Sequence, residues 1–122
     1  MTKKILIIEN EQILAGMYAD RFRQEGWYVS IAATTDEGLH MTKKEKPNIV
    51  LLEILLFNGH GIEYLKTKKE DETIAKISVV VFSNLDEPKT KDESLKLGAL
   101  EYLLKTDYTP KELVAKVKFY LN

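Results

Sequence analysis

Apolar residues in this chain gather in short runs that are separated by longer segments of mixed polarity. Three runs are nearly continuous and rich in β-branched residues, and they cover residues 5–8, 49–52 and 77–82. Such runs are typical of strands that are buried on both faces of a parallel sheet. A run at 100–104 predicts a further strand, and the partly alternating run at 27–33 predicts an edge strand.

The segments between these runs have the spacing of amphipathic helices. Residues 11–25 carry apolar side chains at i, i+3 and i+4 positions, which predicts a buried helix face. The positions on that face are Ile13, Leu14, Met17, Tyr18 and Phe22. Gly26 is the predicted C-cap. Further helices are expected at 35–44, 61–69 and 87–97.

A last helix is predicted after Thr109, because Thr109 suits the N-cap, Pro110 the first helical position and Glu112 the third. Its expected buried face comprises Leu113, Val114, Val117, Tyr120 and Leu121. The chain thus alternates five strands with five helices. This order predicts a parallel sheet with right-handed crossovers, and 122 residues suit one domain with one core.

Composition excludes several classes of protein. The net charge of −1 favours neither nucleic acid nor an anionic membrane. No cysteine is present, so disulfides and thiolate metal sites are excluded, and two distant histidines, His40 and His60, argue against zinc. The first apolar run is too short for a signal peptide and no run could span a bilayer. We therefore expect a soluble cytoplasmic protein.

Polar residues follow four of the five predicted strands directly. Glu9, Asn10 and Glu11 follow the first, Glu53 the third, Ser83 and Asn84 the fourth, and Lys105, Thr106 and Asp107 the fifth. In an open α/β sheet, ligands bind outside the carboxyl ends of the strands. We therefore expect these carboxylates, the hydroxyl and the ammonium to meet at one edge.

The order of these segments resembles the receiver domain of bacterial two-component response regulators. The matching segments are ILIIENE, PNIVLLEILLFNGHG, VVVFSNLD and GALEYLLKTD. The resemblance implies a doubly wound, flavodoxin-like α/β fold with a five-stranded parallel sheet in the order 2-1-3-4-5 and helices on both faces. It also implies a single receiver-like domain over residues 1–122, with no output domain in this sequence.

The resemblance further implies roles for five of the residues at the strand ends and for an aromatic residue inside the fifth strand. Receivers hold Mg²⁺ with an acidic pair, accept a phosphoryl group on an Asp, contact it with a hydroxyl and a Lys, and move an aromatic side chain on activation. The matching positions are Glu9 and Asn10 for the acidic pair, Glu53 for the phosphoacceptor, Ser83 and Lys105 for the phosphate contacts and Tyr102 for the switch aromatic.

The departures from the family pattern lie in the site itself. Glu53 stands in place of Asp, and Asn10 stands in place of the second acid. Phe57 and Thr106 occupy positions where receivers usually have Pro, and Asn84 replaces a small residue. Without Pro, the bond before Thr106 is expected to be trans, since a cis bond there costs about 3–4 kcal/mol.

These changes weaken phosphoryl transfer on physical grounds. Glu extends its carboxylate about 1.5 Å beyond that of Asp, and a misplacement of about 1 Å can cost roughly 10²-fold in rate. Asn10 offers Mg²⁺ a neutral ligand. We expect no cofactor, with only weak Mg²⁺ binding at Glu9, Asn10 and Glu53. Glu53 is instead expected to pair with Lys105 and to accept a hydrogen bond from Ser83, as a fixed charge or as a purely structural ion pair.

Three functions follow as hypotheses. The first is a pseudo-receiver that binds a histidine kinase, an effector protein or a second copy through its fourth helix, fifth strand and fifth helix, without phosphorylation. The second is a working phosphoswitch controlled by a histidine kinase. The third, an enzyme, is disfavoured because Glu9 and Glu11 stand where a phosphate cradle is needed. Direct binding to nucleic acid is not expected, because neither a basic patch nor a recognition helix is evident.

Overall fold

The computed structural model describes residues 2–56 and 60–121, so Phe57 lies outside the described residues. The strands are β1 (Lys4–Ile8), β2 (Tyr28–Ala32), β3 (Ile49–Leu52), β4 (Ser78–Ser83) and β5 (Glu101–Leu104). The helices are α1 (Gln12–Gln24), α2 (Thr35–Glu45), α3 (Gly61–Glu70), α4 (Pro88–Lys96) and α5 (Pro110–Tyr120), with a 3₁₀ turn η1 (Lys105–Asp107). Each predicted strand and helix is confirmed.

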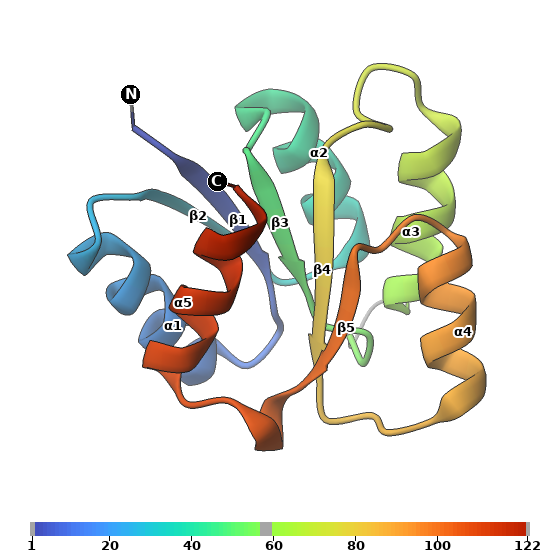
Figure 1. The fold of residues 1–122 in the computed structure, drawn as a ribbon. Coiled ribbons are helices and arrows are strands. Elements are labelled where there is room, and N and C mark those ends of the chain that lie inside the picture. The colour runs from blue at the N-terminus through green and yellow to red at the C-terminus, as the bar shows by residue number, and fades with distance from the viewer. Residues whose placement is uncertain (1, 57–59, 122) are drawn as a thin grey trace.

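All five strands form one parallel sheet in the order β2-β1-β3-β4-β5 (Figure 1). Ile8 at the end of β1 pairs with Ala32 of β2 and with Leu52 of β3. At the other side of the sheet, Ser83 of β4 pairs with Leu104 of β5. The carboxyl ends of the strands are therefore level, and the residues after them share one edge of the sheet. This confirms the predicted fold and strand order.

Helices cover both faces of the sheet and enclose two cores. Helices α1 and α5 lie on one face, where Phe22 and Val117 are fully buried against β1 and β3 residues such as Ile5. Helices α2, α3 and α4 lie on the other face, where Tyr64 and Leu65 are buried against Val50 and its neighbours. Because β1, β3 and β4 are buried on both faces, Ile5–Ile8, Ile49–Leu52 and Val79–Phe82 are apolar in succession rather than alternating.

Helix α1 corrects part of the predicted apolar face. Ile13 is 89% exposed and Met17 is also exposed, whereas Leu14 is half-buried against the core. The buried positions are Ala15, Tyr18, Ala19 and Phe22. These four positions follow the i, i+3, i+4, i+7 spacing that starts at Ala15. The buried face of α1 therefore includes the two alanines in place of Ile13 and Met17. In α5, Leu113, Val114 and Val117 are buried as predicted, while Tyr120 and Leu121 are only half-buried.

The helix termini follow the sequence signals. Gly26 follows α1 with a φ of +86°, a conformation that favours glycine. The Thr109 side chain accepts a hydrogen bond from the Glu112 N–H and the Glu112 side chain accepts one from the Thr109 N–H, which is a complete capping box. Pro110 occupies the first turn of α5. The predicted start of the last helix is thus confirmed.

The peptide bond before Thr106 is trans, as predicted, and no cis bond occurs within residues 2–56 and 60–121. In the same residues, no helix combines the length and the apolar character that a membrane crossing requires.

Candidate functional site

Three chain-distant residues meet at the carboxyl edge of the sheet. Glu9 directly follows β1, Glu53 directly follows β3, and Lys105 directly follows β5. The Glu9 N–H donates to the Ala32 carbonyl at 2.9 Å, which continues the strand ladder to the first site residue. The Glu53 N–H donates to the Ile8 carbonyl at 2.9 Å in the same way. The sheet therefore fixes the backbone of both acids.

The Lys105 ammonium joins the two carboxylates. Its Nζ lies 2.8 Å from Oε1 of Glu53 and also donates to Oε1 of Glu9. The exposed fractions of the three side chains are only 8% for Lys105, 7% for Glu53 and 4% for Glu9. We call this arrangement the Lys105 bridge. The predicted pairing of Glu53 with Lys105 is confirmed, and Glu9 is an additional partner that the sequence analysis did not anticipate.

The Lys105 bridge contains one cation and two anions, so one negative charge needs other compensation. Backbone N–H groups supply it. Oε2 of Glu53 accepts from the N–H of Ile54 at 2.6 Å and of Leu55 at 3.2 Å. Oε2 of Glu9 accepts from the N–H of Glu11 at 3.2 Å. Each acid therefore accepts from the Lys105 ammonium with one carboxylate oxygen and from backbone N–H groups with the other. Hydrogen bonds of this kind stabilise buried carboxylates.

The pKa of Lys105 reflects two opposing effects. Burial lowers this pKa, but the hydrogen bonds from the ammonium to Glu53 and Glu9, together with their charges, raise it by more. Since the folded-state pKa is raised, the charge on Lys105 contributes stability that is fully present below the ordinary pKa of lysine and is lost as the pH rises through the raised value. Lys105 is therefore charged at neutral pH.

Ser83 and Tyr102 form a separate contact beside the bridge. Ser83 is fully buried, and its Oγ accepts from the Leu85 N–H at 3.1 Å. The Tyr102 hydroxyl donates to the Leu85 carbonyl at 2.6 Å. Burial raises the pKa of Tyr102, and a hydrogen bond with Ser83 opposes that rise. Ser83 and Tyr102 thus hold the loop after β4.

The predicted hydrogen bond from Ser83 to Glu53 is not formed, so this part of the prediction was wrong. Among the described residues, the Ser83 hydroxyl accepts from the Leu85 N–H, and Glu53 bonds to Lys105, Ile54 and Leu55 instead. The physical reason is that the longer Glu side chain folds back over its own following backbone. Its second oxygen is satisfied there and not by the hydroxyl.

Replacing Tyr102 with Phe should lower the free energy of unfolding by about 1 kcal/mol, since it removes one hydrogen bond to the Leu85 carbonyl. Urea unfolding measures the change. Tyr28→Phe is the matched control. The Tyr28 side chain is half exposed, and its hydroxyl makes only a long hydrogen bond of 3.5 Å to Glu45, so this substitution should change the free energy of unfolding little. Equal effects of the two variants would contradict the assigned role of Tyr102.

A small open cavity of about 140 Å³ lies over the bridge. It is lined by Glu9, Asn10, Glu11, Glu53, Leu55, Asn84 and Lys105. Two members of the family's acidic pocket, Glu9 and Asn10, therefore lie where the resemblance places them. The cavity is too small for a nucleotide or flavin, since ligand pockets usually span roughly 300–1,000 Å³.

A divalent cation does not fit the site as arranged. The ammonium of Lys105 lies between the carboxylates of Glu9 and Glu53, and the remaining oxygens accept backbone hydrogen bonds. Mg²⁺ needs several oxygen ligands in near-octahedral geometry. Within the part of the chain that the structure describes, no three acidic, histidine or cysteine side chains gather as a metal site.

His60 and Gly61 have structural roles next to the site. Nδ1 of His60 accepts from the Ile62 N–H at 3.2 Å and caps α3, whereas His40 is exposed. A Cβ on Gly61 would lie 2.7 Å from the Glu53 carbonyl oxygen and 2.8 Å from Cα of Ile54. Gly61 thus permits the close approach of α3 to the Glu53 backbone.

The chain belongs to the response regulator receiver domain family, whose sequence pattern matches residues 5–118. Among related proteins, the phosphate regulon transcriptional regulatory protein PhoB of Escherichia coli is 30% identical over 118 residues, which cover 97% of this chain and 51% of PhoB. The alkaline phosphatase synthesis transcriptional regulatory protein PhoP of Bacillus subtilis is 29% identical over 122 residues, covering 100% of this chain and 50% of PhoP. The chain spans about half the length of these curated relatives.

Solved structures agree with this assignment. A CheY-like response regulator receiver domain protein from Methanospirillum hungatei superposes with a TM-score of 0.92 at 27% identity and covers 99% of this chain and 94% of that one. The BeF₃-activated N-terminal receiver domain of Klebsiella pneumoniae RstA superposes with a TM-score of 0.88 at 25% identity, covering 98% and 99%. The fold is therefore that of CheY-like receivers.

Proposed function

We propose that this receiver domain acts as a protein-interaction module that does not depend on phosphorylation. The Lys105 bridge carries the proposal. Lysine is the residue that the resemblance assigns to phosphate binding, and here its ammonium is already neutralised by Glu53 and Glu9. A phosphoryl group would have to break two buried ion pairs before it could bind Lys105. Breaking such pairs is costly because the separated charges remain buried.

In this proposal, Glu53 is a permanent charge where other receivers have a switchable one. Its carboxylate reaches Lys105 at 2.8 Å without any phosphate. The imitation is partial, because a phosphoryl group carries about −1.5 to −2 charge and three acceptor oxygens, whereas Glu53 carries one charge. The domain therefore keeps one conformation at this site, and no Mg²⁺ or other cofactor is required to maintain it.

The proposed docking surface is the face formed by α4, β5 and α5, and the proposed partner is a histidine kinase, an effector protein or a second copy of the chain. Three large apolar side chains are exposed there, Leu95, Leu100 and Phe119, with Phe119 exposed by 71%. The ion pair between Lys116 and Glu101, at 3.4 Å, joins α5 to β5 across this face. Exposed apolar side chains next to paired charges suit a protein partner.

The alternative is a working phosphoswitch under control of a histidine kinase. Membership in the receiver family, the position of Ser83 and Lys105 at the ends of β4 and β5, and that of Tyr102 within β5 favour it. It requires Glu53, or another residue, to accept a phosphoryl group, and Lys105 to leave Glu9.

Intact-mass spectrometry after incubation with acetyl phosphate and Mg²⁺ separates the two functions. We expect no added phosphoryl mass on the natural chain, since Glu53 is engaged by Lys105 and the backbone. The Glu53→Gln variant serves as the matched control, because it keeps the size of the side chain and removes its charge. A phosphoryl mass on the natural chain that disappears in Glu53→Gln would establish the phosphoswitch instead.

A further inference from the structure

Strand β2 presents an open edge of the sheet. It is one of the two outermost strands, and its backbone pairs with β1 through the Tyr28 N–H to the Lys3 carbonyl and the Glu9 N–H to the Ala32 carbonyl, both at 2.9 Å. Since successive residues of a strand turn their backbone groups to opposite sides, the N–H and C=O of Val29 and Ile31 point away from β1. Within the described residues, no strand pairs with that side.

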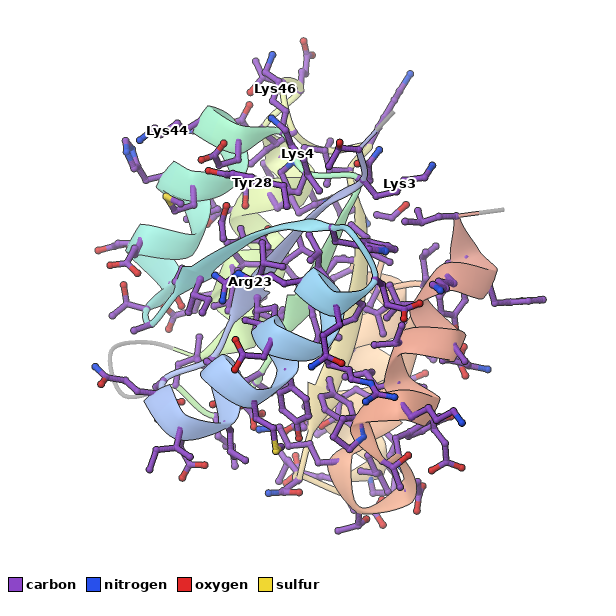
Figure 2. The ribbon with its side chains drawn as sticks, turned by 90° about the vertical axis from the view of Figure 1, so that its left-hand side faces the viewer. Lys3, Lys4, Arg23, Tyr28, Lys44 and Lys46 are labelled. Atoms are coloured by element: carbon purple, nitrogen blue, oxygen red, sulfur yellow. The ribbon has the colours of Figure 1, made fainter. Side chains whose placement is uncertain are left out.

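Basic side chains surround the start of this edge. Figure 2 shows Lys3 and Lys4 of the β1 region and Lys44 and Lys46 at the end of α2 on the same side of the molecule as Tyr28. We call these five residues the β2 basic edge. Lys3, Lys44 and Lys46 are exposed, and among the described residues none of the four lysines forms a salt bridge.

Apolar and aromatic surface accompanies the charge. Tyr28 is 50% exposed and Ile31 is 38% exposed, although both belong to a strand. The Lys4 ammonium lies 5.7 Å from the centre of the Tyr28 ring and donates to the Glu45 carbonyl at 3.4 Å. Arg23 is nearby but is paired with Asp20 at 3.5 Å, so it contributes less free charge.

Helix-dipole compensation explains only part of this charge. Cations at a helix C-terminus are favourable, which accounts for Lys44 at the end of α2. Lys3 precedes β1 and has no helix end to compensate. The chain as a whole has a net charge of −1, so the concentration of cations here is local.

We propose that the β2 basic edge binds an extended acidic segment of a partner protein, which adds to the sheet as a sixth strand beside β2. The segment would hydrogen-bond the backbone of Val29 and Ile31, place its carboxylates near Lys3, Lys44 and Lys46, and rest an apolar side chain on Tyr28. An acidic peptide is favoured over nucleic acid because an extended peptide can pair with the free backbone groups of the β2 edge, which a phosphate backbone cannot do. Lys3, Lys46 and Tyr28 lie near the amino ends of the strands, whereas Lys105 follows β5 at the carboxyl edge, so the proposal is independent of the Lys105 bridge.

Fluorescence anisotropy with a short labelled peptide of alternating glutamate and valine tests the proposal. Binding to the natural chain should weaken with added salt. The triple variant Lys3→Gln, Lys44→Gln, Lys46→Gln should bind about tenfold more weakly. The matched control replaces Lys66, Lys89 and Lys111 with Gln, which are three exposed lysines on other elements, and it should bind as the natural chain does.

Hydrogen exchange locates the contact. The peptide should slow amide exchange at Val29 and Ile31, whose N–H groups face the open edge. Lysines on an edge strand can also serve only to prevent pairing between strands, and in that case the peptide does not bind even at low salt. Absence of binding, binding without protection of Val29 and Ile31, or tighter binding of an oligothymidylate than of the peptide would each overturn the proposal.

Discussion

Replacing Lys105 with Met should lower the free energy of unfolding by about 3–5 kcal/mol, which is the usual cost of removing one partner from a buried ion pair. The substitution keeps an unbranched side chain that is one atom shorter, but it leaves the carboxylates of Glu9 and Glu53 buried without a cation. Only the backbone N–H groups of Ile54, Leu55 and Glu11 would remain to stabilise them. Urea unfolding at neutral pH measures the loss.

A further observation should accompany that loss. The Lys105→Met variant should recover stability in millimolar Mg²⁺ or Mn²⁺, because a divalent cation can take the position between two carboxylates that the ammonium has left. The natural chain should not respond to these cations in this way.

Lys116→Met is the matched control for Lys105→Met. Lys116 pairs with Glu101 at 3.4 Å, but about a third of each side chain is exposed. Exposed pairs of this kind contribute roughly 0–1 kcal/mol. If Lys105→Met were no more destabilising than Lys116→Met, the bridge would have no energetic importance and the account of the site would be wrong.

Restoring the residues typical of receivers should restore phosphoryl transfer. The double variant Asn10→Asp, Glu53→Asp should gain a phosphoryl group from acetyl phosphate and Mg²⁺ at least about 10²-fold faster than the natural chain. The shorter Asp at position 53 would withdraw the carboxylate from the Lys105 ammonium. A second carboxylate at position 10 would give Mg²⁺ the charged ligand that the amide lacks.

The single variants Glu53→Asp and Asn10→Asp are the controls for this gain. Each should gain less than the double variant, because one restores the nucleophile and the other restores the cation site. A folded double variant that takes up no phosphoryl group would contradict the assignment of the defect to positions 10 and 53. Phe57 and Thr106, the other departures from the family pattern, would then be the next positions to restore.

The fold was predictable from the sequence because a strand that is buried on both faces consists of consecutive apolar residues. Ile49–Leu52 is apolar at every position, and only a strand covered on both faces is buried at every position. The capping box at Thr109 and Glu112 likewise fixed the start of α5. Ile13 was placed wrongly, since a helix that buries Ala15 and Ala19 can expose larger side chains on another face.

The residues of the site were predictable from the sequence, but not all of the hydrogen bonds and ion pairs between them were. The carboxyl ends of the strands brought Glu9, Glu53 and Lys105 to one edge, as the topology required. The bridge from Lys105 to Glu9 was missed because β1 lies one strand farther from β5 than β3 does, and the family resemblance pairs Lys105 only with the residue after β3. The partner of Ser83 was missed because it depends on how the Glu53 side chain folds, which strand order does not determine.

A crystal structure of the natural chain grown with Mg²⁺ and beryllium fluoride, a phosphoryl analogue, would test the central claim most directly. The account predicts that the Lys105 ammonium stays at about 3 Å from the carboxylates of both Glu9 and Glu53, with neither metal nor fluoroberyllate bound between them. A Mg²⁺ ion coordinated by Glu9 and Glu53, with fluoroberyllate attached to Glu53 and contacted by a displaced Lys105, would contradict it.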